Sequence, residues 1–297
     1  MINPHPGLPE FDYFKPASLV EASQFLASHV NQARPLMGGT DIFVRMRDGV
    51  WTDKYLVDVK NLDGMNVITF NPASGLKIGA SVNMNLVIAS PEVNRNYPVL
   101  AEAASKVASY QLRTRATIVG NICNASPAGD TTGICMLLGG VLNVHGVDGF
   151  RQITLDNFFL GPGKTVLQAG DIVTSIQFPL PPPGLAGRYI KLGRNNSSDL
   201  AIVGISAVGS LDQSTQSGYR FKLALASVAP VPLVVGKVEE ILAEEPVTEQ
   251  LLSEAAQAAM DACNPIDDVR AGARYRKLMV RNLSLRALKE VWAAIRQ

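Results

Sequence analysis

The chain has 297 residues, of which 47% are hydrophobic and 18% are charged, and its formal net charge is +1. This composition is typical of a soluble globular protein of about two domains. So small a net charge, without a run of Lys or Arg, excludes the electrostatic signature of a nucleic-acid-binding protein. No apolar stretch reaches the ~18 residues that predict a membrane span.

The cysteines and histidines are few and scattered. Cys123, Cys135 and Cys263 form no C-x-x-C pair, so the sequence predicts neither an iron–sulfur cluster nor a structural zinc in this chain. The three histidines are isolated from one another, which predicts no metal site and no catalytic residue. An odd number of cysteines without a secretory signal favours a cytoplasmic protein.

The first half of the chain predicts short helices and strands in alternation. The segment Ser18-Leu19-Val20-Glu21 has the form of a capping box and predicts a helix to about His29. Residues 55–59 and 76–80 are predicted strands, bounded by Gly, Asn and Pro. The prolines after Ser90 and Tyr97 each predict the first turn of a helix.

The second half predicts strands followed by helices. A buried helix end and a strand are expected within residues 135–144, and the proline-rich segment 179–183 is the clearest boundary. Beyond it, residues 189–192, 201–211 and 221–228 are predicted strands, and residues 248–262 and 274–295 are predicted helices. This order is typical of an α+β domain.

Two glycine-rich polar stretches, residues 37–47 and 117–130, are the best candidates for a binding site. We interpret both as turns whose glycines let backbone amides approach one anionic ligand. Neither has the G-x-G-x-x-G form of a Rossmann helix, so a different dinucleotide-binding fold is required. A third motif, Gly161-Pro-Gly-Lys-Thr165, lacks the earlier glycine of a P-loop, because Phe158 stands there, and predicts a turn between two sheet elements.

The two candidate stretches resemble a known family. R-P-L-M-G-G-T-D-I-F-V-R-M-R (residues 34–47) and Q-L-R-T-R-A-T-I-V-G-N-I-C-N-A-S-P-A-G-D (residues 111–130) are similar to the two flavin loops of the FAD-binding medium subunit of molybdenum hydroxylases. That family includes xanthine dehydrogenase and carbon monoxide dehydrogenase. The resemblance runs nearly end to end and includes residues 156–163, 171–179 and 270–276.

The resemblance implies an α+β fold in two domains. Residues 1–178 would form a vanillyl-alcohol-oxidase-type (PCMH-type) FAD-binding domain, with subdomains of about 1–58 and 59–178. Residues 179–297 would form the C-terminal domain of molybdenum hydroxylase flavoproteins, an antiparallel sheet with helices.

The resemblance also assigns roles to individual residues. The pyrophosphate of a non-covalent FAD would lie on the main-chain amides of Leu36, Met37, Gly38, Gly39, Thr40 and Asp41. The second wall would consist of Thr117, Gly120, Asn121 and Asn124. Asp130 would accept a hydrogen bond from an adenosine ribose hydroxyl, Ile172 or Val173 would contact the adenine, and Lys191 would lie near the isoalloxazine. Asp199 would close the neighbouring loop of residues 194–198.

Two positions depart from the family pattern. Val119 stands where most relatives have glycine, and Val107 stands where xanthine dehydrogenase has an aromatic residue near the flavin. Tyr110 is close in sequence to Val107, but it has a different helical phase.

The implied function is electron transfer. FAD in this chain would receive electrons from [2Fe–2S] clusters in a small partner subunit and pass them to an external acceptor, while substrate is oxidised at the molybdenum cofactor of a large partner subunit. A dimer of such heterotrimers is compatible with the family. Two alternatives stay open: a free-standing flavin-dependent reductase of the same fold, and a scaffold subunit that has lost flavin. The sequence does not identify the substrate or the acceptor.

Overall fold

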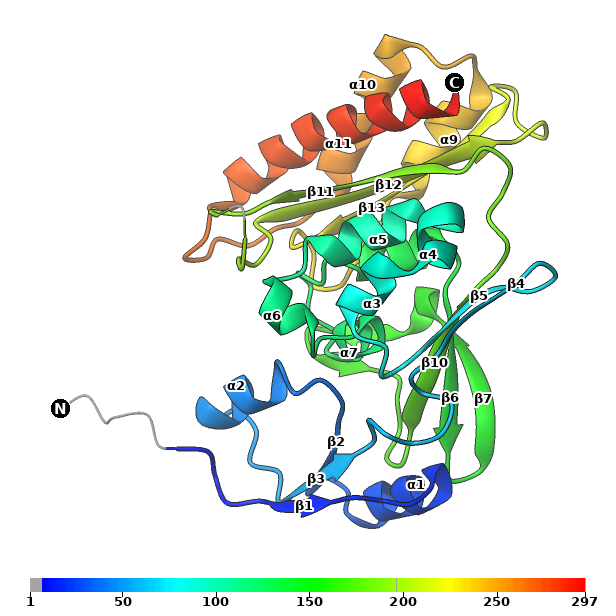
Figure 1. Cartoon of the computed structure of the whole chain (residues 1–297). Coiled ribbons are helices and arrows are strands. Elements are labelled where there is room, and N and C mark those ends of the chain that lie inside the picture. The colour runs from blue at the N-terminus through cyan, green and yellow to red at the C-terminus, as the bar shows by residue number, and fades with distance from the viewer. Residues whose placement is uncertain (1–6, 196, 297) are drawn as a thin grey trace.

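The computed structural model describes residues 7–195 and 197–296. Three larger sheets are stacked along the described part of the molecule, with helices beside and between them (Figure 1). The three sheets follow one another along the sequence. The last sheet and its helices lie at the end of the molecule farthest from the first sheet. The α+β class that we predicted is confirmed.

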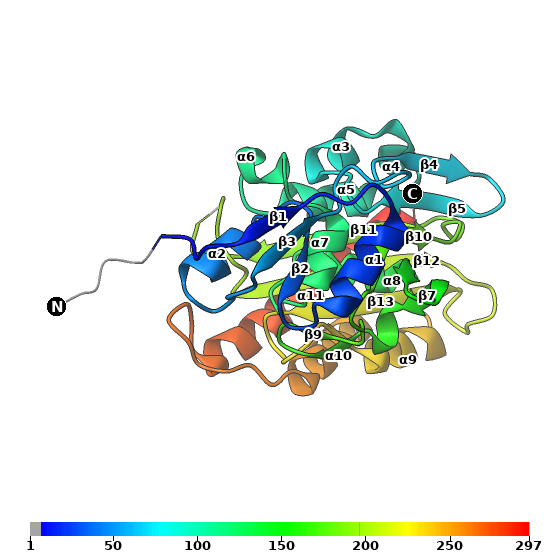
Figure 2. The same ribbon diagram turned by 90° about the horizontal axis from the view of Figure 1, so that it is seen from below.

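The first sheet is small and parallel, with the strand order β1-β3-β2, and the three strands lie side by side in Figure 2. Its elements are β1 (Asp12–Phe14), α1 (Leu19–Ser28), β2 (Ala33–Leu36), α2 (Ile42–Arg47) and β3 (Tyr55–Asp58). Helix α1 begins at the predicted capping box. The Ser18 hydroxyl accepts from the Glu21 amide at 3.1 Å, and the Glu21 carboxylate accepts from the Ala17 amide at 2.6 Å.

The second sheet is antiparallel, with the strand order β4-β5-β10-β6-β7. Its strands are β4 (Ile68–Asn71), β5 (Gly75–Gly79), β6 (Val141–Gly146), β7 (Gly149–Thr154) and β10 (Ile172–Phe178). Between β5 and β6 come α3 (Met84–Ala89), α4 (Pro91–Asn96), α5 (Pro98–Ser105), α6 (Tyr110–Arg113), α7 (Ile118–Cys123) and α8 (Thr132–Leu137). Helices α4 and α5 begin with proline in the first turn, as predicted.

A two-stranded hairpin follows β7 and the short 3-10 helix η1 (Leu155–Asn157). It consists of β8 (Phe159–Gly161) and β9 (Lys164–Thr165), joined by Pro162 and by Gly163 with a φ of 69°. The motif that resembles part of a P-loop is therefore a tight turn between two strands, which confirms our interpretation.

The third sheet is antiparallel and has the order β11-β12-β13-β14. It comprises β11 (Ala186–Leu192), β12 (Val203–Leu211), β13 (Tyr219–Ala226) and β14 (Leu233–Val234), followed by α9 (Gly236–Glu244), α10 (Glu249–Ala262) and α11 (Ala273–Ile295). These last three helices cover one face of the sheet, and α5 and α8 lie against the other face (Figure 1). Because β12 is covered on both faces, every residue of it except Leu211 is buried.

The sheet boundaries agree in position with the domain boundaries that we propose. Strand β3 ends at Asp58, and β10 ends at Phe178, just before the proline-rich segment. We propose that the first two sheets form one domain with two subdomains and that the third sheet forms a second domain. Within the described residues, no helix has both the length and the hydropathy needed to cross a membrane.

Both candidate binding stretches contain a short helix, so the interpretation of each as a turn alone was wrong. Helix α2 occupies the second half of residues 37–47, and α7 lies within residues 117–130. The Thr117 hydroxyl caps α7 by accepting from the Gly120 amide at 2.9 Å. Ile118 and Ile122 are buried, and their packing stabilises a helix whose composition does not favour one.

Candidate functional site

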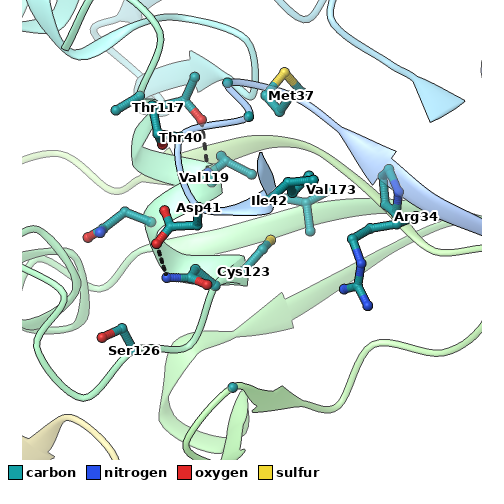
Figure 3. Close-up of a pocket in the computed structure, with 18 of the residues that line it drawn as sticks. Arg34, Met37, Thr40, Asp41, Ile42, Thr117, Val119, Cys123, Ser126 and Val173 are labelled. Carbon is teal, nitrogen blue, oxygen red and sulfur yellow. Dashed lines mark hydrogen bonds between the residues drawn. The ribbon is translucent and has the colours of Figure 1, made fainter. Parts of the chain in front are cut away.

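A cleft of about 730 Å³ lies between the first sheet and the helices of the second (Figure 3). Its walls come from β2 and the turn before α2, from α7 and the loop after it, and from the start of β10. Residues 198–200 contribute from the third sheet's side. The volume is within the roughly 300–1,000 Å³ of ordinary ligand and cofactor pockets.

The structure brings the two candidate stretches together as neighbouring walls of this cleft. A Cβ atom at Gly38 would lie 2.4 Å from the carbonyl oxygen of Arg115, so only glycine permits this approach of the two backbones. Farther along, the Asn124 side-chain amide donates to the Asp41 carboxylate at 3.0 Å, which is the dashed contact at Asp41 in Figure 3. The two segments are thus joined by packing and by a hydrogen bond.

The turn before α2 contains backbone donors that no described residue accepts from. Gly39 has a φ of 76°, a left-handed conformation that favours glycine. Among the described residues, no acceptor pairs with the amides of Gly38, Gly39, Thr40 and Asp41. A run of free amides in a turn is a common site for phosphate and other anions.

Two asparagines place side-chain polar atoms at the opposite wall. The Asn121 side-chain Oδ1 atom accepts from the Thr131 hydroxyl at 2.8 Å and from the Thr131 amide at 3.3 Å. The Asn124 Oδ1 atom is buried and has no hydrogen-bond partner within the described part of the chain. A buried polar atom without a partner is costly, and a bound ligand with a hydroxyl or amide donor would satisfy it. The residues of the cleft therefore fit a polar dinucleotide such as FAD.

Asp130 is a buried carboxylate at the cleft wall. Its two oxygens accept from the Tyr189 hydroxyl at 2.6 Å and from the Lys191 ammonium at 2.7 Å. Burial raises the pKa of Asp130 and outweighs the opposite effect of the Lys191 charge. Burial, with the neighbouring carboxylate, also raises the pKa of Tyr189 well above its usual value.

Most of the residues predicted from the sequence line the cleft. These are Met37, Gly38, Gly39, Thr40, Asp41, Thr117, Gly120, Asn121, Asn124, Asp130, Ile172 and Val173. Leu36 does not line it, because its side chain packs in a small core with Met46 and Leu56. Lys191 does not line the cleft, but it forms an ion pair with the lining residue Asp130. The roles of these residues toward a cofactor stay predictions.

Other lining residues were given no individual role in the sequence analysis. The Arg34 guanidinium stacks 3.8 Å from the ring centroid of Trp51 and donates to Asp53 at 2.8 Å. Arg34 and Trp51 both line the cleft, as do Gly163 and Thr165 of the β8–β9 hairpin. They come from separate elements, so only the folded chain places them together.

The departures from the family pattern also lie in the cleft. Val119 and Val107 both line it and are 4% and 9% exposed, so their side chains are packed in the wall. Tyr110 is 65% exposed on α6 and is not among the lining residues. Tyr110 therefore does not supply the aromatic side chain that is missing at position 107.

The cleft and the two-part fold are typical of one class of protein, a dinucleotide-binding flavoprotein with an appended α+β domain. Comparison with known families identifies the family within this class. Residues 9–181 match the FAD-binding domain of molybdopterin dehydrogenases, and residues 188–291 match the C-terminal domain of carbon monoxide dehydrogenase flavoproteins. The chain belongs to this family of FAD-binding medium subunits of xanthine and carbon monoxide dehydrogenase type.

Individual relatives match over nearly their whole length. The carbon monoxide dehydrogenase medium chain of Hydrogenophaga pseudoflava is 31% identical over 285 residues, which cover 96% of this chain and 98% of the relative. The putative xanthine dehydrogenase FAD-binding subunit of Escherichia coli is 28% identical over 283 residues, which cover 95% and 96%. The family that we predicted from the two glycine-rich stretches is confirmed.

Solved structures share the fold. A chain of carbon monoxide dehydrogenase from Hydrogenophaga pseudoflava superimposes with a TM-score of 0.91 at 31% identity, covering 96% of this chain and 98% of that chain. A chain of reconstituted carbon monoxide dehydrogenase from Oligotropha carboxidovorans gives a TM-score of 0.90 at 27% identity, covering 96% and 99%. The predicted combination of an FAD-binding domain with a C-terminal antiparallel sheet and helices is confirmed.

Proposed function

We propose that this chain is the FAD-containing electron-transfer subunit of a multi-subunit molybdenum hydroxylase. In this role it lies between the [2Fe–2S] clusters of a small subunit and an external acceptor, while a large subunit oxidises the substrate at its molybdenum cofactor. The observation that carries the proposal is the cleft in which Gly38 and Asn124 join two segments of the family's FAD-binding domain. FAD supplies the required chemistry, because it accepts electrons singly and releases them in pairs.

The chain's own residues bind and orient the cofactor. The free amides of Gly38, Gly39 and Thr40 are suited to the pyrophosphate. Asn124 Oδ1, which needs a donor, is suited to a hydroxyl of the cofactor. Ile172 and Val173 form an apolar wall at the start of β10, and both are buried. Such a surface is suited to the adenine.

Asp130 and Lys191 act together at one part of the cofactor. The family resemblance implies a ribose partner for Asp130 and an isoalloxazine partner for Lys191, but the two side chains form an ion pair of 2.7 Å. Two groups in direct contact cannot serve opposite ends of an extended dinucleotide. Lys191 also donates to the carbonyl oxygen of Lys106, next to the cleft residue Val107. We place the pair at the isoalloxazine end, since the family resemblance puts position 107 near the flavin ring.

The names of the relatives support a hetero-oligomer. Several are medium chains or FAD-binding subunits, as in carbon monoxide dehydrogenase and in the glyceraldehyde dehydrogenase of Sulfolobus acidocaldarius. By this analogy we propose a large molybdenum subunit and a small [2Fe–2S] subunit as partners, in one heterotrimer or a dimer of heterotrimers. The three free cysteines favour a cytoplasmic location for the assembly.

Affinity purification from the native host tests the electron-transfer role. The tagged chain should co-purify with two further subunits, one containing molybdenum and one containing [2Fe–2S] clusters. Anaerobic reduction of the clusters should then bleach the flavin absorption band within the complex. A yellow protein that purifies alone and turns over by itself would instead indicate the free-standing reductase. A colourless protein that binds no added FAD would indicate the scaffold.

Bound FAD is expected to be non-covalent. The described residues lining the cleft include no histidine, and their one cysteine is Cys123, whose pKa burial raises to about 12. A thiol that stays protonated is a poor nucleophile toward the flavin ring. Acid precipitation should therefore release all the flavin into the supernatant. Colour that stays with the pellet would contradict non-covalent binding.

A further inference from the structure

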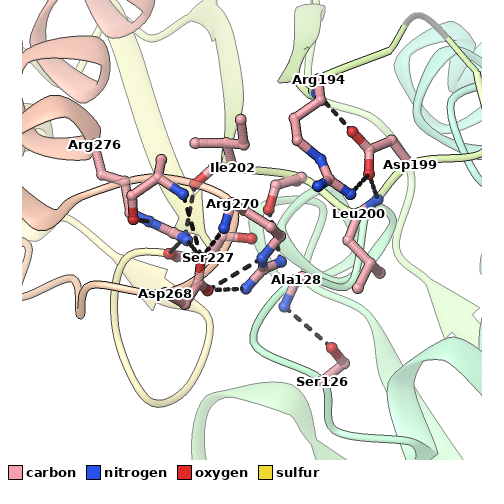
Figure 4. A network of polar contacts seen from close by, with 12 residues as sticks. Ser126, Ala128, Arg194, Asp199, Leu200, Ile202, Ser227, Asp268, Arg270 and Arg276 are labelled. Carbon is pink, nitrogen blue, oxygen red and sulfur yellow. Dashed lines mark hydrogen bonds and ion pairs between the residues drawn. The ribbon is translucent and has the colours of Figure 1, made fainter.

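Arg276, in the first turn of α11, is a buried cation in the C-terminal domain, with 1% of its surface exposed. Its guanidinium donates to the carbonyl oxygens of Ile202 at 3.0 Å and Ser227 at 2.9 Å, and to the Asp268 carboxylate at 2.6 Å (Figure 4). A buried charge is tolerated only when it is paired and hydrogen-bonded in this way. Arg276 thereby joins the segments next to β12 and β13.

Ser227, directly after β13, has a φ of 67°, a left-handed conformation that residues other than glycine rarely adopt. Its hydroxyl is buried and has no partner among the described residues, so its side chain does not hold it there. The backbone of Ser227 holds this conformation instead. Its carbonyl oxygen accepts from Arg276, and its amide donates to the carbonyl oxygen of Pro127 at 2.7 Å.

Pro127 lies between residues that line the cleft. Ser126, Ala128, Gly129 and Asp130 around it all line the cleft wall, so we call residues 126–130 the cleft loop. The hydrogen bond from Ser227 fixes the backbone of this loop from the side of the C-terminal domain. A continuous set of contacts therefore runs from Arg276 through Ser227 to the cleft loop, although Arg276 itself is not a lining residue.

We propose that Arg276 is a positioning residue for FAD, which acts by holding Ser227 and, through it, the cleft loop. The proposal rests on the proposed function in one respect, that FAD occupies this cleft. A loop that is already ordered costs less to fix on binding, so the Arg276 contacts raise the affinity for FAD. By linkage, bound FAD must in turn stabilise the contact between Ser227 and Pro127.

The test compares Arg276→Lys with the matched variant Arg270→Lys. Arg270 also pairs with Asp268 and donates to a backbone carbonyl, that of Ala201, but the described structure has no hydrogen bond from Arg270 to Ser227. We expect Arg276→Lys to weaken FAD binding to the folded protein by about tenfold, within the usual range of coupling between sites. It should also change the visible circular dichroism of the bound flavin. Arg270→Lys leaves the hydrogen bond from Arg276 to Ser227 in place, so it should have a much smaller effect on both.

Hydrogen exchange on the unaltered protein provides a test that requires no variant. Loading with FAD should slow exchange of the Ser227 amide, but not of the Asn264 amide, which donates to Val228 at the same strand end without contacting the cleft loop. Equal FAD affinity in both variants, or unchanged Ser227 exchange, would overturn the positioning role alone. A wild-type protein that binds no FAD would overturn the proposed function and this inference together.

Discussion

Gly38→Ala is expected to lower the affinity for FAD by about ten- to hundredfold, which corresponds to about 1–3 kcal/mol of overpacking in the cleft wall. The added Cβ would lie 2.4 Å from the carbonyl oxygen of Arg115 and 3.0 Å from its carbonyl carbon. Both are backbone atoms, so no side-chain rotation can relieve the contact. The two segments must move apart, and the amides of the turn before α2 move with them.

Gly161→Ala is the matched control for that substitution. A Cβ at Gly161 would have no atom within 4 Å, its φ is not positive, and the residue does not line the cleft. The measurement is the flavin-to-protein ratio after dialysis against FAD-free buffer, together with the melting temperature of the stripped protein. If Gly38→Ala keeps its full complement of flavin, the close approach of the two segments is not required for binding.

The parts of the fold that could be predicted depend on local chemistry. The capping box at Ser18 and the prolines that begin α4 and α5 act within one helical turn, so the sequence shows them directly. The two glycine-rich stretches were likewise visible, and the family resemblance named their ligand. Helix α7 was missed because it is stabilised by the burial of Ile118 and Ile122 rather than by helix propensity.

The parts that could not be predicted depend on contacts between distant residues. Asp130 and Lys191 are 61 positions apart, one just before α8 and the other in β11 of the third sheet. The family resemblance assigned them separate roles, and their ion pair was not predicted. The link between Ser227 and Pro127 likewise joins segments that are far apart in the chain. Periodicity and motif spacing describe one element at a time, and they contain no information about which side chains meet between domains.

The second prediction with a large effect is Lys191→Met, which leaves the Asp130 carboxylate buried without its cation. Lys191 is 11% exposed and Asp130 is 9% exposed at their side chains, so solvent offers little compensation. Removal of one partner from a buried pair costs about 3–5 kcal/mol. We expect the stripped protein to lose stability on this scale at neutral pH, and the affinity for FAD to fall as well.

Lys60→Met is a matched control for the effect on FAD. Lys60 pairs with Asp58 at 2.6 Å, and Asp58 also accepts from the Tyr13 hydroxyl, so the arrangement repeats that of Tyr189, Asp130 and Lys191. Neither Asp58 nor Lys60 lines the cleft. Lys60→Met should therefore reduce stability without changing the affinity for FAD.

The loss of stability in Lys191→Met should depend on pH in a defined direction. Burial already raises the pKa of Asp130 above its ordinary value of 3.8, and removal of the cation raises it further. Well below pH 3.8, Asp130 is protonated in both the folded and the unfolded chain, so its charge costs no stability. As the pH rises toward the raised pKa, the unfolded chain ionises more readily than the folded one, and stability is lost.

Urea unfolding at about 25 °C tests this direction. The difference in the free energy of unfolding between the FAD-free variant and the FAD-free wild type should be smaller at pH 5 than at pH 8. The double variant Asp130→Asn with Lys191→Met should not show this pH dependence. If the difference in stability between Lys191→Met and wild type does not depend on pH, Lys191 does not act by stabilising the Asp130 charge.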